Sequence, residues 1–230
     1  MNILALDTSG VTASIAILRD EMVLAENFLN LGRNHSEILL PSIDQLLTAT
    51  GLELRAIDLF ACTVGPGSFT GIRIGVSTVK GLALAMDRPI AGLSALEVLA
   101  MNAMGWPGKI CPMIDARREQ VYAGLYADNG TELLMNIIPE RLDRATDFLE
   151  LIAGETVFIG TGAVKYGDSI RRKLGGRCHF LIDHIQQIHA SAVGVLAGRK
   201  ALAGGLTDAV RLMPLYLRRS EAEEKINRQC

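Results

Sequence analysis

The chain has 230 residues, which at roughly 150 residues per domain corresponds to one large domain or two small ones. Apolar residues make up 49% and charged residues 21%, which excludes disordered and collagen-like chains. A net charge of -2 and 5% aromatic residues argue against a protein that binds nucleic acid unaided. We expect no membrane span, because no apolar run reaches roughly 18 residues, and no secretory signal.

The four cysteines are scattered and form no CxxC pair. Cys62 and Cys111 lie in apolar, strand-like runs, so we expect buried free thiols rather than a metal site. Free thiols without an export signal predict a cytoplasmic location.

The first half of the chain alternates apolar runs with turn and helix signals. Asn34, followed by Glu37 three residues later, is a helix-start pattern, and Pro41 predicts a kink in that helix. The predicted elements are strands at 3–6, 13–18 and 22–27, a helix at 34–50, a strand at 57–64, a helix at 72–86, a strand at 89–93 and a helix that Ser94 caps and that runs to about 104.

Gly105-Trp106-Pro107-Gly108 is the clearest break, and after it the order of elements repeats. Asn129-Gly130 is a hairpin signal within this half. The predicted elements are strands at 109–115, 120–126 and 131–138, a helix at 143–153, a strand at 156–160, a helix from about 163 to 174, a strand at 178–182 and a helix at 191–203.

Both halves therefore have the order strand-strand-strand-helix-strand-helix-strand-helix. Such a duplication predicts a two-lobed α/β protein with a cleft between the lobes. We place the lobes at residues 1–105 and 106–230, with the last helix free to pack back on the first lobe.

The loop at residues 63–71, between a predicted buried strand and a predicted helix, is the most informative stretch. Backbone N–H groups at a helix start can bind an anion, and glycine lets it approach closely, so Gly65 and Gly67 are candidate nucleotide-binding residues. A plain strand-to-helix turn explains the loop equally well. The spacing matches neither GxGxxG nor GxxxxGK[ST], so a Walker-type ATPase loop is not supported.

The helix after this loop carries two stripes of residues. One is apolar and suits a core; the second consists of smaller residues, Gly71, Gly75, Thr78 and Leu82. Glycine inside a helix costs about 1 kcal/mol relative to alanine, so a close neighbour is expected there. A helix that is apolar on two faces is buried on two sides. That second side lies either inside this chain or against a partner subunit.

Carboxylates end the first strand of each half, where α/β proteins place ligand groups. Asp7 and Ser9 in the first half could hold a phosphate, while Asp115 is followed by two arginines that suit a phosphate or a partner. Gly160 and Gly162 repeat the glycine turn in the second half, where a nucleotide base or ribose could pack. Each of these features also suits a local turn. The four histidines do not cluster, so we predict no metal site.

Residues 65–75, Gly-Pro-Gly-Ser-Phe-Thr-Gly-Ile-Arg-Ile-Gly, closely resemble the motif of the bacterial TsaB (YeaZ) family. Stretches that agree with the family in the same order occur at residues 7–9, 35–41, 94–97, 115–122 and 214–218. The resemblance covers nearly the whole chain. It implies an actin-like (ASKHA, ribonuclease H-like) fold with a duplicated βββαβαβα order.

The resemblance also implies a function. Family members help to make threonylcarbamoyladenosine at position 37 of tRNAs that read ANN codons. They are partners of TsaD, the catalytic paralogue, and of TsaE, an ATPase, and they form homodimers when alone. The resemblance thus implies that tRNA is contacted only through the complex. The one cofactor that it leaves open is ATP or ADP at the complex interface.

The resemblance further suggests which residues act. TsaD has a metal-binding histidine pair where this chain has Ser94-Ala95-Leu96-Glu97, so we expect a non-catalytic subunit. The family pairs through its first two helices, here about 34–50 and 70–86, which makes Leu39, Ile43 and Leu46 candidate interface residues beside the small-residue stripe. The alternative is a glycoprotease-like hydrolase or a weak ATPase acting alone; a small-molecule kinase is disfavoured by the loop after Asp115.

Overall fold

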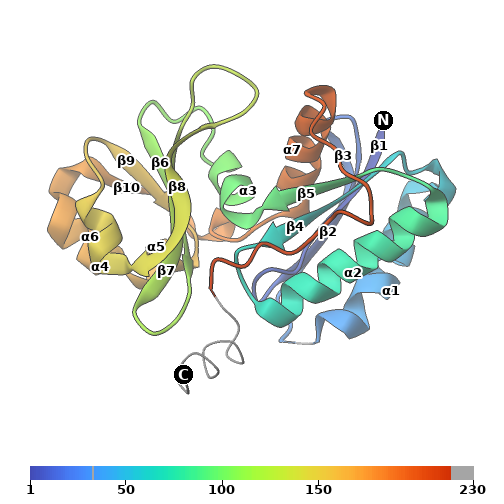
Figure 1. Cartoon of the computed structure of the whole chain (residues 1–230), viewed down its shortest axis with the longest axis horizontal. Helices are drawn as coiled ribbons and strands as arrows, with labels where there is room; N and C mark the ends of the chain where they lie inside the picture. The colour runs from blue at the N-terminus through green and yellow to red at the C-terminus, as the bar shows by residue number, and fades with distance from the viewer. Residues whose placement is uncertain (33, 219–230) are drawn as a thin grey trace.

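The computed structural model describes residues 1–32 and 34–218, which form two five-stranded sheets with helices packed on them (Figure 1). The tail from Ser220 to Cys230, which its charges suggested to be solvated or ordered by a partner, lies outside these residues. The first half contains β1 (Asn2–Asp7), β2 (Ala13–Arg19), β3 (Met22–Leu29), α1 (His35–Thr50), η1 (Leu54–Ala56), β4 (Leu59–Gly65), α2 (Phe69–Met86), β5 (Ile90–Ser94) and α3 (Ala95–Met101).

The second half repeats this order, which confirms the predicted duplication. The predicted helix at 163–174 is divided into two short helices, α5 and α6. The elements are β6 (Lys109–Asp115), β7 (Gln120–Ala127), β8 (Met135–Arg144), α4 (Ala145–Glu150), β9 (Thr156–Ile159), α5 (Thr161–Lys165), α6 (Gly167–Leu174), η2 (Gly175–Arg177), β10 (Cys178–Phe180), η3 (Asp183–Ile185) and α7 (Ala190–Leu202).

The two sheets have the same topology. The first has the strand order β3-β2-β1-β4-β5, and the second has β8-β7-β6-β9-β10. In each, an antiparallel meander of three strands is extended by two strands parallel to its first member. Because the first strand is central in both sheets, Asp7 and Asp115 end equivalent strands.

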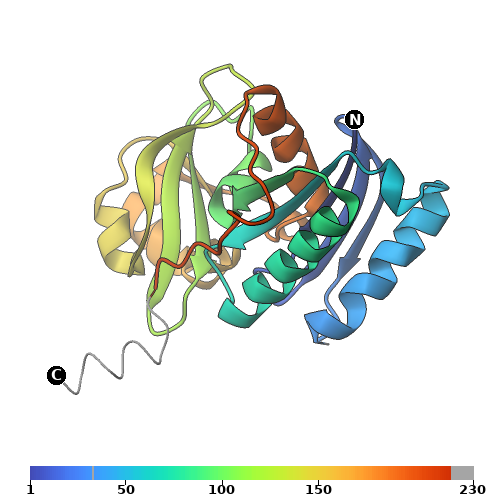
Figure 2. The same ribbon diagram turned by 45° about the vertical axis from the view of Figure 1, so that its right-hand side comes forward.

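The first sheet is covered on both faces. Alternate side chains of β1 and β4 point to opposite sides, as the pleat requires. Leu4, Leu6 and Phe60 pack under α1 and α2, whereas Ile3 and Ala61 pack under α7 and α3. Figure 2 shows α1 and α2 side by side on one face, with α7 behind the sheet.

Helix α7 belongs to the second half in sequence but packs on the first sheet. Its glycines allow the close approach: a Cβ at Gly194 would lie 2.2 Å from Leu18 Cδ1, and one at Gly198 would lie 3.3 Å from Ile3 Cδ1. Helix α3 packs against α7 in the same core cluster, and through Ala100 it also packs against the second sheet. The two lobes are therefore joined by helices rather than by a flexible linker.

Two predicted boundaries are wrong. The Asn129-Gly130 turn is not a two-residue hairpin, because the side chains of Asp128 and Asn129 accept the N–H groups of Gly130 and Thr131 and close a longer loop. Pairing starts only at Ala127 with Met135. Strand β8 then continues to Arg144, opposite Gln120, and thereby displaces the predicted helix start to Ala145.

The start of α1 also differs from the expectation. The Asn34 side chain caps no backbone N–H; its Nδ2 donates to Glu37 Oε1 at 2.7 Å instead. Helix α1 then runs through Pro41 as one element. By contrast, Ser94 caps α3 as predicted, because its Oγ accepts from the N–H groups of Leu96 and Glu97.

Cys62 and Cys111 are buried free thiols, as predicted, and Cys178 is also free. Burial raises the pKa of the Cys62 thiol to about 12, which keeps it protonated and unreactive at neutral pH. No helix within residues 1–32 and 34–218 combines the length and the apolarity needed to cross a bilayer.

Candidate functional site

Three of the predicted nucleotide-binding residues, Asp7, Ser9 and Gly67, meet where the loop after β1 packs against the loop before α2. Asp7 is buried, and its Oδ1 accepts from Ser9 Oγ at 2.6 Å, Ser9 N at 3.1 Å and Thr63 Oγ1 at 2.5 Å. Desolvation by burial raises the pKa of Asp7, while these hydrogen bonds lower it in part. The Ser9 hydroxyl, which we expected to hold a phosphate, thus donates to a carboxylate of its own chain.

The glycines of the second loop are needed for contact with the first. A Cβ at Gly67 would lie 2.3 Å from the carbonyl oxygen of Ser9, and one at Gly71 would lie 2.0 Å from that of Thr8. Thr8 Oγ1 donates to the carbonyl oxygen of Gly71 at 2.8 Å, which ties the loops together from the other side. Close packing of two backbones therefore explains Gly67 and Gly71 without a ligand.

Two of the N–H groups at the start of α2, where an anion could bind, donate within the chain. The N–H of Ser68 donates to the Ser9 carbonyl oxygen at 2.7 Å, and the N–H of Gly71 donates to Ser68 Oγ at 3.2 Å. Helix α2 begins three residues before the predicted position because Ser68 provides this cap.

Gly65 contacts the C-terminal segment of the chain, residues 206–218, which we call the strap. A Cβ on Gly65 would lie 2.4 Å from the carbonyl oxygen of Leu215, whose N–H donates to the Val64 carbonyl oxygen at 2.7 Å. Gly65 also has φ of +118°, a conformation open mainly to glycine. We predicted that an anion could approach this glycine closely, whereas in the structure the strap does so, which sequence reasoning did not place here.

In the second half, Gly160 and Gly162 face the end of β6. Added Cβ atoms would lie 2.4 Å and 3.0 Å from the carbonyl oxygen of Met113. The N–H of Gly160 donates to Gln186 Oε1 at 2.7 Å. As in the first half, the glycine turn packs on its own central strand. Binding of a base or ribose at this turn stays a prediction.

Asp115 is half-buried and pairs with Lys165, whose Nζ lies 2.9 Å from Oδ2. Its Oδ1 accepts the N–H of Arg117 at 3.0 Å. Arg218 of the strap donates to the Ala116 carbonyl oxygen at 2.8 Å. The strap thus contacts the end of β4 and the loop after β6, which belong to different lobes (Figure 1).

The predicted interface residues divide into two groups. Leu39, Ile43 and Leu46 of α1 are buried against the first sheet of this chain. Their side chains therefore belong to the core of this chain, and their assignment to a partner interface stays a prediction. The helical spacing that suggested a common face was correct, but that face points inward.

Gly71 and Gly75 are likewise internal. A Cβ on Gly75 would lie 2.4 Å from Thr8 Oγ1 and 3.1 Å from Leu6 Cδ1, so the glycine allows α2 to approach β1 rather than a partner. Thr78 and Leu82 of the same stripe are half-buried and remain open to solvent in part.

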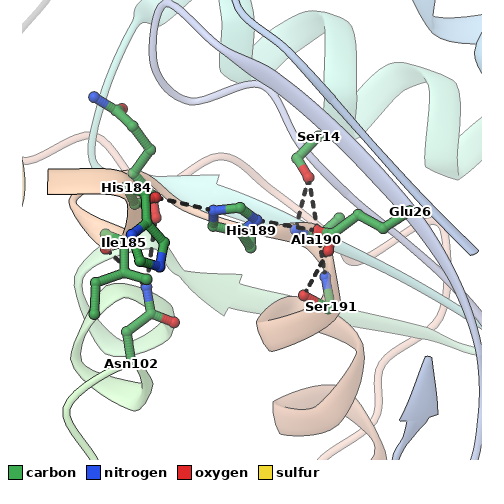
Figure 3. Close-up of polar contacts among 9 residues, drawn as sticks. Ser14, Glu26, Asn102, His184, Ile185, His189, Ala190 and Ser191 are labelled. Carbon is green, nitrogen blue, oxygen red and sulfur yellow. Dashed lines mark hydrogen bonds and ion pairs between the residues drawn. The ribbon is translucent and has the colours of Figure 1, made fainter. Parts of the chain in front are cut away.

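A polar cluster that we did not predict lies at the start of α7 (Figure 3). Glu26 Oε1 accepts from Ser14 Oγ and from the N–H of Ser191, both at 3.0 Å, and Oε2 accepts from Ser191 Oγ at 2.9 Å. His189 Nδ1 lies 3.6 Å from Glu26 Oε1, while its Nε2 faces the carbonyl oxygen of His184. The serine hydroxyls point to the carboxylate rather than to the imidazole, so the cluster caps α7 and does not form a nucleophile–base pair.

Two further observations concern ligands. In the part of the chain that the structure describes, no three His, Cys, Asp or Glu side chains gather as metal ligands would. Two shallow hollows on the surface are lined by Arg88 and Arg211 in one case and by Arg199 and Leu202 in the other. Neither hollow is lined by the predicted nucleotide-binding residues.

Comparison with known proteins decides the family. The chain is 37% identical to the tRNA threonylcarbamoyladenosine biosynthesis protein TsaB of Bacillus subtilis, over 98% of this chain and 97% of that protein. The chain belongs to the TsaB family. A family model described as TsaD, tRNA N6-adenosine threonylcarbamoyltransferase, matches residues 23–226 of this chain.

The structures agree with this assignment. YeaZ from Pseudomonas aeruginosa matches with a TM-score of 0.79 and 32% identity, over 94% of this chain and 99% of that one. Component A of (R)-2-hydroxyglutaryl-CoA dehydratase from Acidaminococcus fermentans matches with a TM-score of 0.54 at 14% identity, over 88% of this chain and 99% of that one, which speaks for the fold alone. The fold is therefore actin-like, as the resemblance to the TsaB family implied.

Proposed function

We propose that this chain acts in the biosynthesis of threonylcarbamoyladenosine on tRNA as a non-catalytic subunit that binds and activates a TsaD-family partner. The similarity to TsaB of Bacillus subtilis over 98% of the chain supports the pathway. In the further detail of the proposal, the partner transfers the threonylcarbamoyl group to adenosine 37 of ANN-decoding tRNAs. TsaE is the further protein partner, and the chain forms a homodimer when alone.

The hydrogen bonds of the polar side chains in the loop after β1 support a partner role rather than a catalytic one. The Asp7 carboxylate and the Ser9 and Thr8 hydroxyls are buried and hydrogen-bonded within the chain. All three internal donors to the Asp7 carboxylate bond its Oδ1, so a substrate that used this oxygen would have to replace those hydrogen bonds. The site therefore stabilises the lobe and leaves the chemistry to the partner.

The observation that carries the proposal is an apolar strip on the outer side of α1 and α2. Leu40 is 57% exposed, and Leu47 lies one heptad further along the same side of α1. On α2, Ile74, Thr78 and Leu82 recur at four-residue spacing and are half-buried. This outer strip replaces the inward-facing residues of the sequence-based interface and retains Thr78 and Leu82.

Activation follows from binding alone. A partner that binds one conformation of TsaD better than another raises the population of that conformation by its difference in affinity. The chain then needs no reactive group, only a rigid surface. Helix α2 suits this role because Gly75 and Val76 fix it on the sheet while Ile74 and Thr78 remain partly exposed to solvent.

The test measures binding of a purified TsaD-family protein by isothermal titration calorimetry. Leu40→Glu places a charge in the strip and is expected to weaken binding at least tenfold, as loss of a central apolar contact does. Leu202→Glu is the matched control, because Leu202 is 85% exposed at the end of α7, away from the strip. Equal affinity of both variants and the wild type would reject the strip as the pairing surface.

A second arm tests the non-catalytic role. The chain alone is incubated with ATP and with a peptide substrate, and product formation is followed. We expect no turnover above the buffer blank. Robust turnover that is lost in Asp7→Asn but not in Leu40→Glu would instead assign the chain as the alternative hydrolase or ATPase.

A further inference from the structure

Helix α6 and the short helix η2 that follows it carry a group of exposed cations on the second lobe. Four cations fall within seven residues, and no Asp or Glu occurs between residues 169 and 182. All four side chains are exposed, whereas Ile170 and Leu174 of the same helix are buried in the core of this lobe. The group, which we call the basic patch, consists of Arg171, Arg172, Lys173 and Arg177.

Two members of the basic patch are paired with carboxylates. Arg171 Nη1 lies 3.4 Å from Asp168 Oδ1, and Lys173 pairs with Glu150 of α4. The guanidinium of Arg171 also lies 4.5 Å from the centre of the Phe180 ring, which fixes its position on the surface. These two cations therefore add little net charge to the patch.

The other two members contact neutral groups only. Arg172 Nη2 donates to Ser169 Oγ at 3.4 Å, and Arg177 Nε donates to the Leu174 carbonyl oxygen at 3.3 Å. In residues 1–32 and 34–218 neither arginine forms an ion pair, and the second carboxylate of α4, Asp147, accepts from a threonine of its own helix instead. The patch thus holds two cations in excess of its ion pairs, in a chain whose net charge is -2.

The position of the basic patch at the end of a helix gives it a structural role as well. Cations in the last turn interact favourably with the carbonyl end of a helix, and Arg177 bonds one of these carbonyl oxygens directly. This role affects the stability of α6, whereas a ligand contact affects binding. The two roles can therefore be measured separately.

The surroundings of the basic patch favour a nucleic-acid backbone over a protein. The core of a protein interface is enriched in aromatic and other apolar side chains, but the large apolar side chains of α6 are buried. Between the cations, a Cβ added to Gly175 or Gly176 would meet no heavy atom of the described residues within 4 Å. Exposed cations around an open main chain suit phosphate groups, which such cations contact without reading the bases.

The basic patch is also remote from the proposed pairing strip. Figure 1 shows α6 at one end of the longest axis of the molecule and α1 and α2 at the other. A partner seated on α1 and α2 therefore does not need to cover the patch. A long ligand held by that partner can reach it.

We propose that the basic patch of α6 and η2 contacts the phosphodiester backbone of RNA. This inference rests on the proposed function, because the assembly formed with the TsaD-family partner would carry the tRNA. Guanidinium groups suit phosphate oxygens through paired hydrogen bonds. Two such contacts add affinity and orientation to the assembly without giving the chain alone the basic excess needed to bind RNA unaided.

The test measures tRNA binding by the assembly of this chain with its TsaD-family partner, over a series of salt concentrations. Arg172→Gln and Arg177→Gln each remove one of the two excess charges. We expect two- to fivefold weaker binding for each variant, as for loss of one exposed charge pair. The slope of log affinity against log salt should become shallower by about 0.7–0.9 for each arginine removed. Arg172→Lys keeps the charge and should keep the slope of the wild type.

Arg19→Gln is the matched control. Arg19 is an exposed cation of the first lobe, and its Nε donates to a neutral side chain, Asn2, at 3.5 Å, much as Arg172 does to Ser169. The control should leave the affinity and the slope unchanged. An equal loss in Arg19→Gln would show an effect of total charge and would overturn the inference.

Three further outcomes would overturn the RNA contact. Wild-type affinity and slope in both glutamine variants, with a lowered midpoint of thermal unfolding, would leave only the structural role at the end of α6. A loss of affinity for ATP at unchanged affinity for tRNA would indicate a nucleotide phosphate. A loss confined to binding of the TsaD-family partner would indicate a protein carboxylate.

The two proposals fail separately. If wild-type chain neither binds the partner nor supports tRNA modification, the proposed function falls, and the RNA contact falls with it. If modification depends on the chain but Arg172→Gln and Arg177→Gln bind tRNA like the wild type, only the RNA contact falls.

Discussion

Two glycines of α2 lie less than two turns apart but meet different surroundings. A Cβ on Gly75 would lie 2.4 Å from Thr8 Oγ1, whereas a Cβ on Gly81 would have no heavy atom within 4 Å. Gly75 is thus fixed by packing on β1, whereas Gly81 costs helix stability and no contact within residues 1–32 and 34–218 offsets this cost. Packing therefore explains glycine at position 75, but it does not explain glycine at position 81 among the described residues.

Alanine at each position separates these roles. Gly75→Ala is expected to lower the free energy of unfolding by about 1–3 kcal/mol, because the helix must move off the sheet. Gly81→Ala is expected to raise it by up to about 1 kcal/mol through helix propensity. Urea unfolding of both variants gives the comparison, and equal effects of the same sign would contradict the assigned packing of α2.

The raised pKa of Asp7 predicts how the stability of the fold depends on pH. Its pKa is raised above the usual 3.8 by desolvation, so the unfolded chain ionises first as pH rises. The stability that the protonated group contributes is present below the unfolded pKa and is lost as pH rises through the folded one. Asp7→Asn keeps an acceptor for Ser9 and Thr63 and does not titrate.

The free energy of unfolding of the wild type minus that of Asp7→Asn should therefore fall as pH rises from about 4 towards 7. Urea titrations at several pH values give this difference directly. A difference that stays constant, or that rises with pH, would show that hydrogen bonds to Asp7 outweigh its desolvation.

At the scale of elements, the strap is the part that sequence patterns left unassigned. Leu212 is buried against the first lobe beside Gly92, and Lys80 of α2 donates to the Leu212 carbonyl oxygen at 3.0 Å. Arg73 donates to Tyr216 at 3.0 Å, and Phe69 stacks on the same ring. The strap therefore holds α2 as well as joining the lobes.

Leu212→Ala tests the contribution of the strap to stability. Removing a buried leucine side chain is expected to cost about 2–4 kcal/mol. The neighbouring Met213 is 73% exposed, so Met213→Ala should change the unfolding free energy by less than about 0.5 kcal/mol. If both variants unfold at the same urea concentration, the strap does not anchor on the first lobe in solution.

Elements with strong local signals could be predicted from the sequence, and those set by distant partners could not. The periodic spacing of apolar residues predicted the order of strands and helices in both halves. Ser94 was correctly identified as a helix cap. The length of β8 depends on its pairing with β7. The sequence of the strap has neither a periodic spacing of apolar residues nor a helix-capping residue that would have predicted its position. Its one signal was the agreement of residues 214–218 with the TsaB family.

The candidate site shows the same limit at the level of contacts. Sequence patterns placed Asp7 at the end of one strand and Gly65 and Gly67 after another. The structure brings Gly67 against Ser9, beside Asp7, and brings the strap against Gly65. A sequence motif cannot show which atoms lie where a glycine lacks a side chain. Here it is filled by Ser9 and Leu215 of the same chain, so residues that matched a ligand pattern are explained by internal packing.

At the scale of the whole molecule, the lobes are fastened at several points. Glu140 of β8 accepts hydrogen bonds from Ser94, which caps α3, and from Tyr126 at 2.5 Å. Burial raises the pKa of Glu140. Together with α7 and the strap, this contact ties the second sheet to the first. A molecule fastened in this way is suited to present a fixed surface rather than to close on a substrate.

The central claim is that this chain promotes threonylcarbamoyladenosine formation by pairing with a TsaD-family partner and not by its own chemistry. The most direct measurement is the rate of tRNA modification by the purified partner, titrated with wild-type chain, with the strip variant Leu40→Glu/Thr78→Arg and with Leu202→Glu. We predict stimulation by the wild type and by Leu202→Glu, and loss of both pairing and stimulation in the strip variant at unchanged stability. Modification by this chain without the partner, or full stimulation by a variant that no longer pairs, would contradict the claim.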